Sequence, residues 1–217
     1  PGFVVLATCR RREARGEFEG SIEREVEILH DAVAAGAKLV DVEIETAEAA
    51  PDAPRALAGA ARVVLSYHDF DGTPPLEEAL ARLRRHPADI YKLATMGLQP
   101  SDNLRLLRLF DAEDAPPLVA MAMGEVGAPT RILSPSRGAV FTFAAPDPDP
   151  GLAAGGTAPG QFSAAAMRDM FQVPNRTRKT RIFGVVASPV AHSLSPVLHN
   201  RAFRRRRIDA CYLPFRV

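Results

Sequence analysis

The sequence predicts an α/β protein of the (β/α)8-barrel class, and three observations support this prediction. Strand-like apolar runs alternate with helix-like segments at a repeat of roughly 25–35 residues, a rhythm that requires parallel strands covered by helices. Polar side chains stand near the carboxyl ends of the predicted strands, where barrel enzymes place their chemistry. The content of 47% hydrophobic and 24% charged residues is typical of a globular protein. The rhythm alone also fits a doubly wound sheet, and the strand-end polar residues favour the barrel.

The amino-terminal elements follow from apolar periodicity. Residues 3–10 read as a buried strand, and Ser21 is expected to cap the helix that follows. Residues 38–45 predict a second strand whose alternation places Asp41, Glu43 and Glu45 on one acidic face. The second predicted strand therefore gives the sheet an acidic face.

The middle of the chain continues the same alternation. Residues 56–61 predict a short helical segment, residues 62–68 a third strand, and Leu76, Leu80 and Leu83 the apolar face of a helix. The fourth strand, 89–96, carries Lys92. Lys92 thus lies within an apolar run.

Three further segments complete the predicted barrel part. Ser101 is expected to cap a leucine-rich helix, residues 117–123 and 138–143 read as strands, and residues 163–171 as a helix. This gives six strands, whereas a closed barrel of this type has eight. The two remaining strands are expected before Pro1.

Composition changes after Phe171. Residues 173–180 are polar and have no apolar period, which indicates a linker. A strand at 182–187, a helix beginning at Pro196 with Ser195 as its N-cap, and a strand at 212–217 predict the start of a second α/β unit. The predicted domains are an amino-terminally truncated barrel at 1–172, a linker at 173–180, and a carboxyl-terminally truncated domain at 181–217.

Charge and cysteine usage exclude several function classes. A net charge of +1 gives no general field for nucleic acid or an anionic membrane. Cys9 and Cys211 lie far apart with no partner motif, which argues against a metal site or a disulfide framework and fits a cytoplasmic location. The sequence contains no signal peptide and no apolar run of transmembrane length. The oligomeric state stays open, a homo-oligomer included.

Lys92 is the candidate nucleophile. The 27 Lys and Arg residues include only three lysines, Lys38, Lys92 and Lys179, so the sequence uses arginine for charge. A lysine kept in an apolar strand suggests amine chemistry, because a guanidinium stays protonated whereas a desolvated ammonium can lose its proton. A solvated lysine at a strand end is the competing interpretation.

His68 and Arg131 would complete a site around Lys92. Strand alternation places His68 and Lys92 at the same barrel mouth if both point inward. An imine on the lysine would act as an electron sink while the imidazole removes the proton α to the carbonyl, which suits elimination of a β-hydroxyl. Arg131, expected on the loop after the fifth strand, could hold a substrate carboxylate.

Four motifs in register resemble the type I 3-dehydroquinate dehydratase family over residues 1–172. They are LSYHDFDGTP at 65–74, DIYK at 89–92, GAPTR at 127–131 and APGQ at 158–161. The resemblance implies that Lys92 forms the imine with 3-dehydroquinate and that His68 is the general acid and base. It implies no cofactor for this reaction, and it implies substrate contacts from Arg10, Glu43, Arg131, Phe143, Thr157 and Gln161.

One position departs from that family. The family has a glutamate four residues after the arginine at position 10, and Ala14 stands there in this chain. Glu13 is adjacent, and whether it takes the place of that glutamate stays open.

Residues 183–200, FGVVASPVAHSLSPVLHN, resemble the opening of shikimate dehydrogenase. The resemblance implies that Ser193 and Ser195 bind the shikimate carboxylate, and hydroxyls beside a helix N-terminus suit an anion. The competing interpretation is that they only cap a helix. The family's catalytic lysine and aspartate and its NADP-binding half are not among these residues.

The sequence thus predicts part of a bifunctional shikimate-pathway enzyme. The barrel would make 3-dehydroshikimate, and the complete dehydrogenase would reduce it to shikimate with NADPH. The isolated 217-residue chain is expected to be weakly active or inactive. Two alternatives stay open, namely another class I Schiff-base lyase or aldolase, and a catalytically dead barrel used as a binding module.

Overall fold

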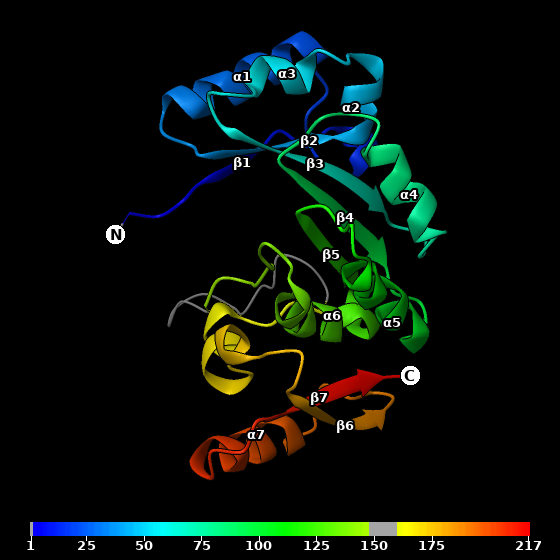
Figure 1. Ribbon diagram of the computed structural model, residues 1–217, viewed down its shortest axis with the longest axis vertical. Coiled ribbons are helices and arrows are strands. Elements are labelled where there is room, and N and C mark those ends of the chain that lie inside the picture. Colours follow the sequence, from blue (N-terminus) through cyan, green and yellow to red (C-terminus); the bar gives the residue numbers. More distant parts are fainter. Residues whose placement is uncertain (1, 148–159) are drawn as a thin grey trace. The chain divides into compact units, whose positions relative to one another are not determined.

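The computed structural model describes residues 2–147 and 160–217. Its helices and strands alternate along the chain (Figure 1). In order they are β1 (Leu6–Thr8), α1 (Ile22–Ala34), β2 (Leu39–Glu43), α2 (Ile44–Ala49), α3 (Ala53–Leu57), β3 (Arg62–Asp69), α4 (Leu76–Leu83), β4 (Ile90–Met96), α5 (Pro100–Arg108), β5 (Leu118–Met123), α6 (Gly124–Arg137), β6 (Arg181–Ala187), α7 (Ser195–Arg205) and β7 (Ala210–Arg216).

The first five strands form one sheet in the order β1-β2-β3-β4-β5. Strands β1, β2 and β3 pair in parallel, with Leu6 opposite Leu39 and Leu39 opposite Arg62. Sequential parallel strands joined by helices are the arrangement that the alternating pattern predicted. The α/β class is therefore confirmed.

Helices α1 and α3 pack together on one side of β1 and β2 (Figure 1). The Ser21 hydroxyl accepts a hydrogen bond from the Arg24 backbone N–H at 3.3 Å and caps α1 as predicted. Gly36, at φ +112°, lets the chain turn back toward β2. Between helices and strands lies a core of fully buried apolar side chains: Leu29, Val40, Val42, Leu57, Val63, Leu65, Leu83 and Ile90.

Four predicted boundaries need correction. The short helix predicted at 56–61 is α3, at Ala53–Leu57. Strand β1 covers only Leu6–Thr8 of the predicted 3–10, and Phe3 is 99% exposed, because β1 is the edge strand in the sheet order and bonds to β2 alone. Strand β2 ends at Glu43, and α2 begins at Ile44. Helix α5 is capped by Gln99 and Asp102 in a capping box, and Ser101 lies inside the helix.

The predicted strand at 138–143 does not form. Gly138 ends α6 at φ +110°, and the residues after it are irregular up to an isolated bridge between Ala145 and Ser163. Phe141 and Phe143 pack edge to face on each other, with ring centroids 5.5 Å apart. The predicted helix at 163–171 contains a π-helical turn at Ala166–Met170.

The chain divides into two compact units. The first comprises the described residues up to His68 together with Glu77–Leu93 and Pro116–Leu118. The second comprises Asp69–Leu76, Ala94–Ala115 and the described residues from Val119 to Val217.

Within the second unit, β6 and β7 form a separate parallel pair, with Arg181 opposite Ala210 and Ala187 opposite Arg216. The predicted linker includes buried Val173. Its Arg178 donates hydrogen bonds to the carbonyls of Phe110 and Arg137 at 2.7 and 2.8 Å. Residues 173–178 are thus packed against α6, while the domain boundaries stay a prediction.

Candidate active site

Lys92 occupies the third position of β4 and is 4% exposed. Its Nζ donates a hydrogen bond to Oδ2 of Asp41 on β2 at 2.6 Å, and the two side chains form an ion pair. A buried ammonium needs such a partner because removing one charge from water costs several kcal/mol. The side chain that was singled out from the sequence is therefore held inside the first unit beside a carboxylate.

Asp41 is charged in this arrangement. Burial would raise the pKa of Asp41, but the Lys92 ammonium outweighs burial, and the pKa lies below its ordinary value. Oδ1 of Asp41 is buried and accepts no hydrogen bond from the described residues. The alternation that grouped Asp41 with Glu43 was the sequence signal for this residue, but it did not reveal the contact with Lys92.

His68 lies near the end of β3, with its side chain 5% exposed. Arg10 donates a hydrogen bond to Nε2 of His68 at 2.9 Å, so Nε2 is the acceptor nitrogen. Burial, followed by the charges of Lys92 and Arg10, lowers the pKa of His68 to about 3. The imidazole is therefore neutral near pH 7, which is the state a general base requires.

Glu43, on β2, lies between the same two partners. Its Oε1 is 3.6 Å from Nδ1 of His68 and 3.6 Å from Nε of Arg10. Burial, which outweighs the attraction of Arg10, raises the pKa of Glu43 to about 7. This carboxyl group can therefore change its protonation state near neutral pH next to the candidate base.

Glu13, the acidic residue next to Ala14, faces solvent. Glu13 lies on a 3-10 turn, Arg12–Ala14, with its side chain 74% exposed, and it pairs with Arg11 at 3.6 Å. Among the residues described here, the carboxylate that reaches Arg10 comes from Glu43.

Arg131 belongs to the second unit and lies on helix α6, not on a loop as predicted. It is 2% exposed, and burial lowers its pKa to about 10. Its Nη1 lies 3.5 Å from the Met121 sulfur, and its Nε has no hydrogen-bond partner among the described residues. A buried guanidinium in this state is suited to an anionic ligand, because a carboxylate accepts two of its parallel N–H donors.

Two other predicted contacts belong to the same stretch of sequence. Phe143 is partly buried in the irregular segment after α6, and the Thr142 hydroxyl beside it donates to the Arg131 carbonyl at 2.8 Å. Thr157 lies outside the described residues.

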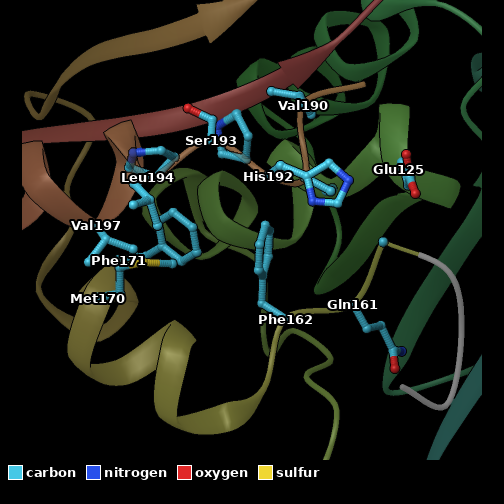
Figure 2. A pocket seen from close by; sticks show the side chains of 15 residues that line it. Glu125, Gln161, Phe162, Met170, Phe171, Val190, His192, Ser193, Leu194 and Val197 are labelled. Atoms are coloured by element: carbon cyan, nitrogen blue, oxygen red, sulfur yellow. The ribbon is translucent and has the colours of Figure 1, made fainter. Parts of the chain in front are cut away.

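Gln161 and Ser193 line one pocket of about 370 Å³ in the second unit (Figure 2). Its wall is mostly apolar, with the rings of Phe162 and Phe171 4.8 Å apart. Ser195 is not among its lining residues. The structure thus brings together one candidate from each of the two sequence resemblances.

The predicted cap of α7 needs correction. Leu194 is the N-cap, and Ser195 is the first helical residue. The Ser193 hydroxyl accepts a hydrogen bond from the Ser195 backbone N–H at 3.3 Å. Ser193, and not Ser195, therefore satisfies a backbone N–H at the start of α7.

The described part of the chain shows neither a metal centre nor a membrane-spanning helix. Residues 2–147 and 160–217 contain no cluster of three or more His, Cys, Asp or Glu residues that could hold a metal ion. None of the described helices is both long and apolar enough to cross a bilayer.

Buried Lys92 and His68 on neighbouring parallel strands are features of α/β-barrel proteins that place their chemistry on the strands. Comparison with known proteins identifies the family within this class. Residues 2–178 match the family model of type I 3-dehydroquinase, and residues 185–217 match that of the shikimate dehydrogenase substrate binding domain. The chain belongs to the type I 3-dehydroquinase family. The predicted barrel class is confirmed with it.

Three relatives illustrate both matches. The chain is 34% identical over 178 residues to a 3-dehydroquinate dehydratase of Dehalococcoides mccartyi, covering 81% of this chain and 78% of that protein. It is 29% identical over 213 residues to the chloroplastic bifunctional 3-dehydroquinate dehydratase/shikimate dehydrogenase of Arabidopsis thaliana, covering 96% of this chain but 34% of that protein. The solved dehydroquinate dehydratase and shikimate dehydrogenase from S. pombe AroM is 26% identical, with a TM-score of 0.60, covering 99% of this chain and 40% of that one.

Proposed function

We propose that the protein dehydrates 3-dehydroquinate to 3-dehydroshikimate through an imine on Lys92. The observation that carries this proposal is the buried Lys92–Asp41 pair, whose lysine charge helps to keep the nearby His68 neutral. The family match and the dehydratase relatives supply the substrate class. A binding module that had lost its activity would gain nothing from keeping an ammonium buried at this cost.

The steps follow from the side chains. His68 takes one proton from the Lys92 ammonium, and the free amine attacks the ketone carbon. The same proton leaves with the adduct hydroxyl as water, which gives the protonated imine. His68 removes the proton α to the imine carbon, the electron pair moves into an enamine, and the β-hydroxyl leaves as water with a proton from His68. A second water then hydrolyses the imine and releases the enone. The sum is the loss of one water, with no redox partner needed.

The neighbouring groups have supporting roles in this proposal. Asp41 holds Nζ and balances the positive charge of the imine. Arg10 and Glu43 contact the two ring nitrogens of His68 and fix its orientation. Arg131 binds the substrate carboxylate, and Phe143, Thr157 and Gln161 contact the same substrate.

We infer a second activity for the protein from the match over residues 185–217. The product would be reduced to shikimate with NADPH, with Ser193 and Ser195 on the substrate carboxylate and the cofactor bound outside this chain. Both substrates are small and soluble, so we propose a cytoplasmic location and no nucleic-acid or membrane partner.

Formation of the enone absorbance of 3-dehydroshikimate by the purified intact protein tests the dehydratase proposal. Lys92→Ala should abolish the signal, and His68→Ala should lower turnover by roughly 10²–10⁴-fold. Lys179→Ala, which removes an exposed lysine, is the matched control and should retain the parent rate. Enone formation by Lys92→Ala at the parent rate would refute the imine mechanism, and no activity in the parent protein would favour the binding-module alternative.

A further inference from the structure

Helix α6 is a poor helix in isolation, although it carries Arg131. Pro129 and Pro135 lie inside it, and each lacks the N–H that would bond four residues back. The carbonyl that Pro135 leaves without a helical donor is that of Arg131, and it accepts the Thr142 hydroxyl instead. Gly127 lowers the helix propensity further. The position of α6 therefore depends on its tertiary neighbours.

On one side α6 lies tightly against β5. A Cβ added to Gly127 would come within 2.5 Å of Ala122, so only glycine allows this approach. The Thr130 hydroxyl accepts the Ala122 backbone N–H at 2.9 Å, and Arg131 reaches the Met121 sulfur from the same side. These contacts set the depth of α6 on β5.

On another side α6 contacts β7, which belongs to the shikimate dehydrogenase-like segment. Ile132, the residue after Arg131, shares one core cluster with Cys211 and Leu213, and all three side chains are fully buried. Arg216 of β7 forms an ion pair with Glu125 in the first turn of α6. Strand β7 therefore touches α6 at its start and next to Arg131.

We propose that β7 is a positioning element for the dehydratase reaction, because it holds α6 and thereby the Arg131 guanidinium in place for the substrate carboxylate. The inference rests on the proposed function of Arg131. Lys92 and His68 lie on β4 and β3 in the other unit. Loosening the β7 contact therefore weakens substrate binding more than it slows the chemical steps, and KM rises while kcat is largely kept.

Leu213→Ala in the intact protein is the primary test. It leaves a cavity in the core cluster that contains Ile132, and we expect KM for 3-dehydroquinate to rise roughly tenfold, since small misplacements of a binding group are costly. Leu57→Ala is the matched control, because it removes an equally buried leucine from α3 in the other unit. Leu57→Ala should lower the thermal midpoint without raising KM.

Exchanging the charges of Glu125 and Arg216 tests the same contact independently, which matters if Leu213→Ala fails to fold. Glu125→Arg and Arg216→Glu each place like charges together, and each should raise KM by roughly two- to fivefold, since both side chains are 40–45% exposed and solvent weakens the pair. The double variant restores the pair with reversed polarity and should return KM toward the parent value. Rescue by the double variant separates positioning from a general loss of stability.

Arg131→Ala separates the two claims, that Arg131 binds the substrate and that β7 positions Arg131. An unchanged KM in this variant would remove the assigned role of Arg131, whatever β7 does. If Arg131→Ala raises KM but Leu213→Ala and both charge reversals leave it at the parent value, the positioning role of β7 is overturned. A rise in all four, with recovery in the double exchange, is the expected result.

Discussion

The Lys92–Asp41 pair places two opposite charges in the interior of the first unit, where both side chains are almost fully buried. Breaking such a pair from one side leaves an uncompensated buried charge, whereas replacing both partners is far less costly. The pair can therefore be tested by measuring the free energy of unfolding, without any assay of activity.

Asp41→Asn should destabilise the protein by about 3–5 kcal/mol, because the Lys92 ammonium loses its counter-ion. The double variant Asp41→Asn/Lys92→Met should recover much of that loss while staying inactive. Urea unfolding of both variants and the parent measures the difference. Equal stability of Asp41→Asn and the parent would show that the ammonium has another partner.

The raised pKa of Glu43 leads to a prediction for how folding stability depends on pH. Its folded-state pKa is raised to about 7 from 4.5, so its contribution to stability is present below about 4.5 and is lost as the pH rises through 7. The stability of the parent relative to Glu43→Gln should therefore fall by about 3 kcal/mol between pH 4.5 and 8. Thermal unfolding across that range checks it, and a difference that is constant with pH would contradict the assignment.

At the scale of elements, one hydroxyl hydrogen-bonds both α6 and β5. Thr130 accepts the Ala122 N–H and donates to the Gly127 carbonyl at 2.7 Å. Thr130→Val keeps the shape but leaves the buried Ala122 N–H unsatisfied, which should cost about 1–3 kcal/mol. Denaturant unfolding measures this cost. Ser101→Ala, on the exposed face of α5, should have little effect and is the control.

The strands of the first unit could be predicted because apolar runs such as Val63–Leu65 identify buried strands without knowledge of their partners. The segment at 138–143 could not, because its alternation is the same whether the aromatic rings face a neighbouring strand or each other. The Thr142 hydroxyl replaces the donor that Pro135 lacks by bonding the Arg131 carbonyl. The two residues are eleven positions apart, so local sequence patterns do not reveal this contact.

The candidate site was predictable to the same extent. Alternation and the rarity of lysine pointed to Lys92 and His68, and alternation grouped Asp41 with Glu43. The partner of each charge depends on strand register, which fixes Asp41 opposite Val64 and Glu43 opposite Ser66. The sequence carries no direct signal for that register, so the Lys92–Asp41 contact and the exposure of Glu13 became visible only in three dimensions.

At the scale of the whole molecule, residues 181–217 share a hydrophobic core with the dehydroquinase segment. Cys211 and Leu213 of β7 share their core cluster with Ile132, Met167 and Phe171 of the dehydroquinase segment. A piece of this length also buries too little surface to fold alone. Residues 181–217 expressed separately should therefore give a circular dichroism spectrum of an unfolded chain. A cooperative thermal transition in that piece would contradict this prediction.

Reductive trapping tests the central claim, imine formation on Lys92, most directly. The intact protein is incubated with 3-dehydroquinate and borohydride, and its mass is measured before and after digestion. The account predicts one covalent adduct on the peptide that contains Lys92, present in His68→Ala and absent in Lys92→Ala. An adduct that persists in Lys92→Ala, or an active parent protein that forms none, would contradict the account.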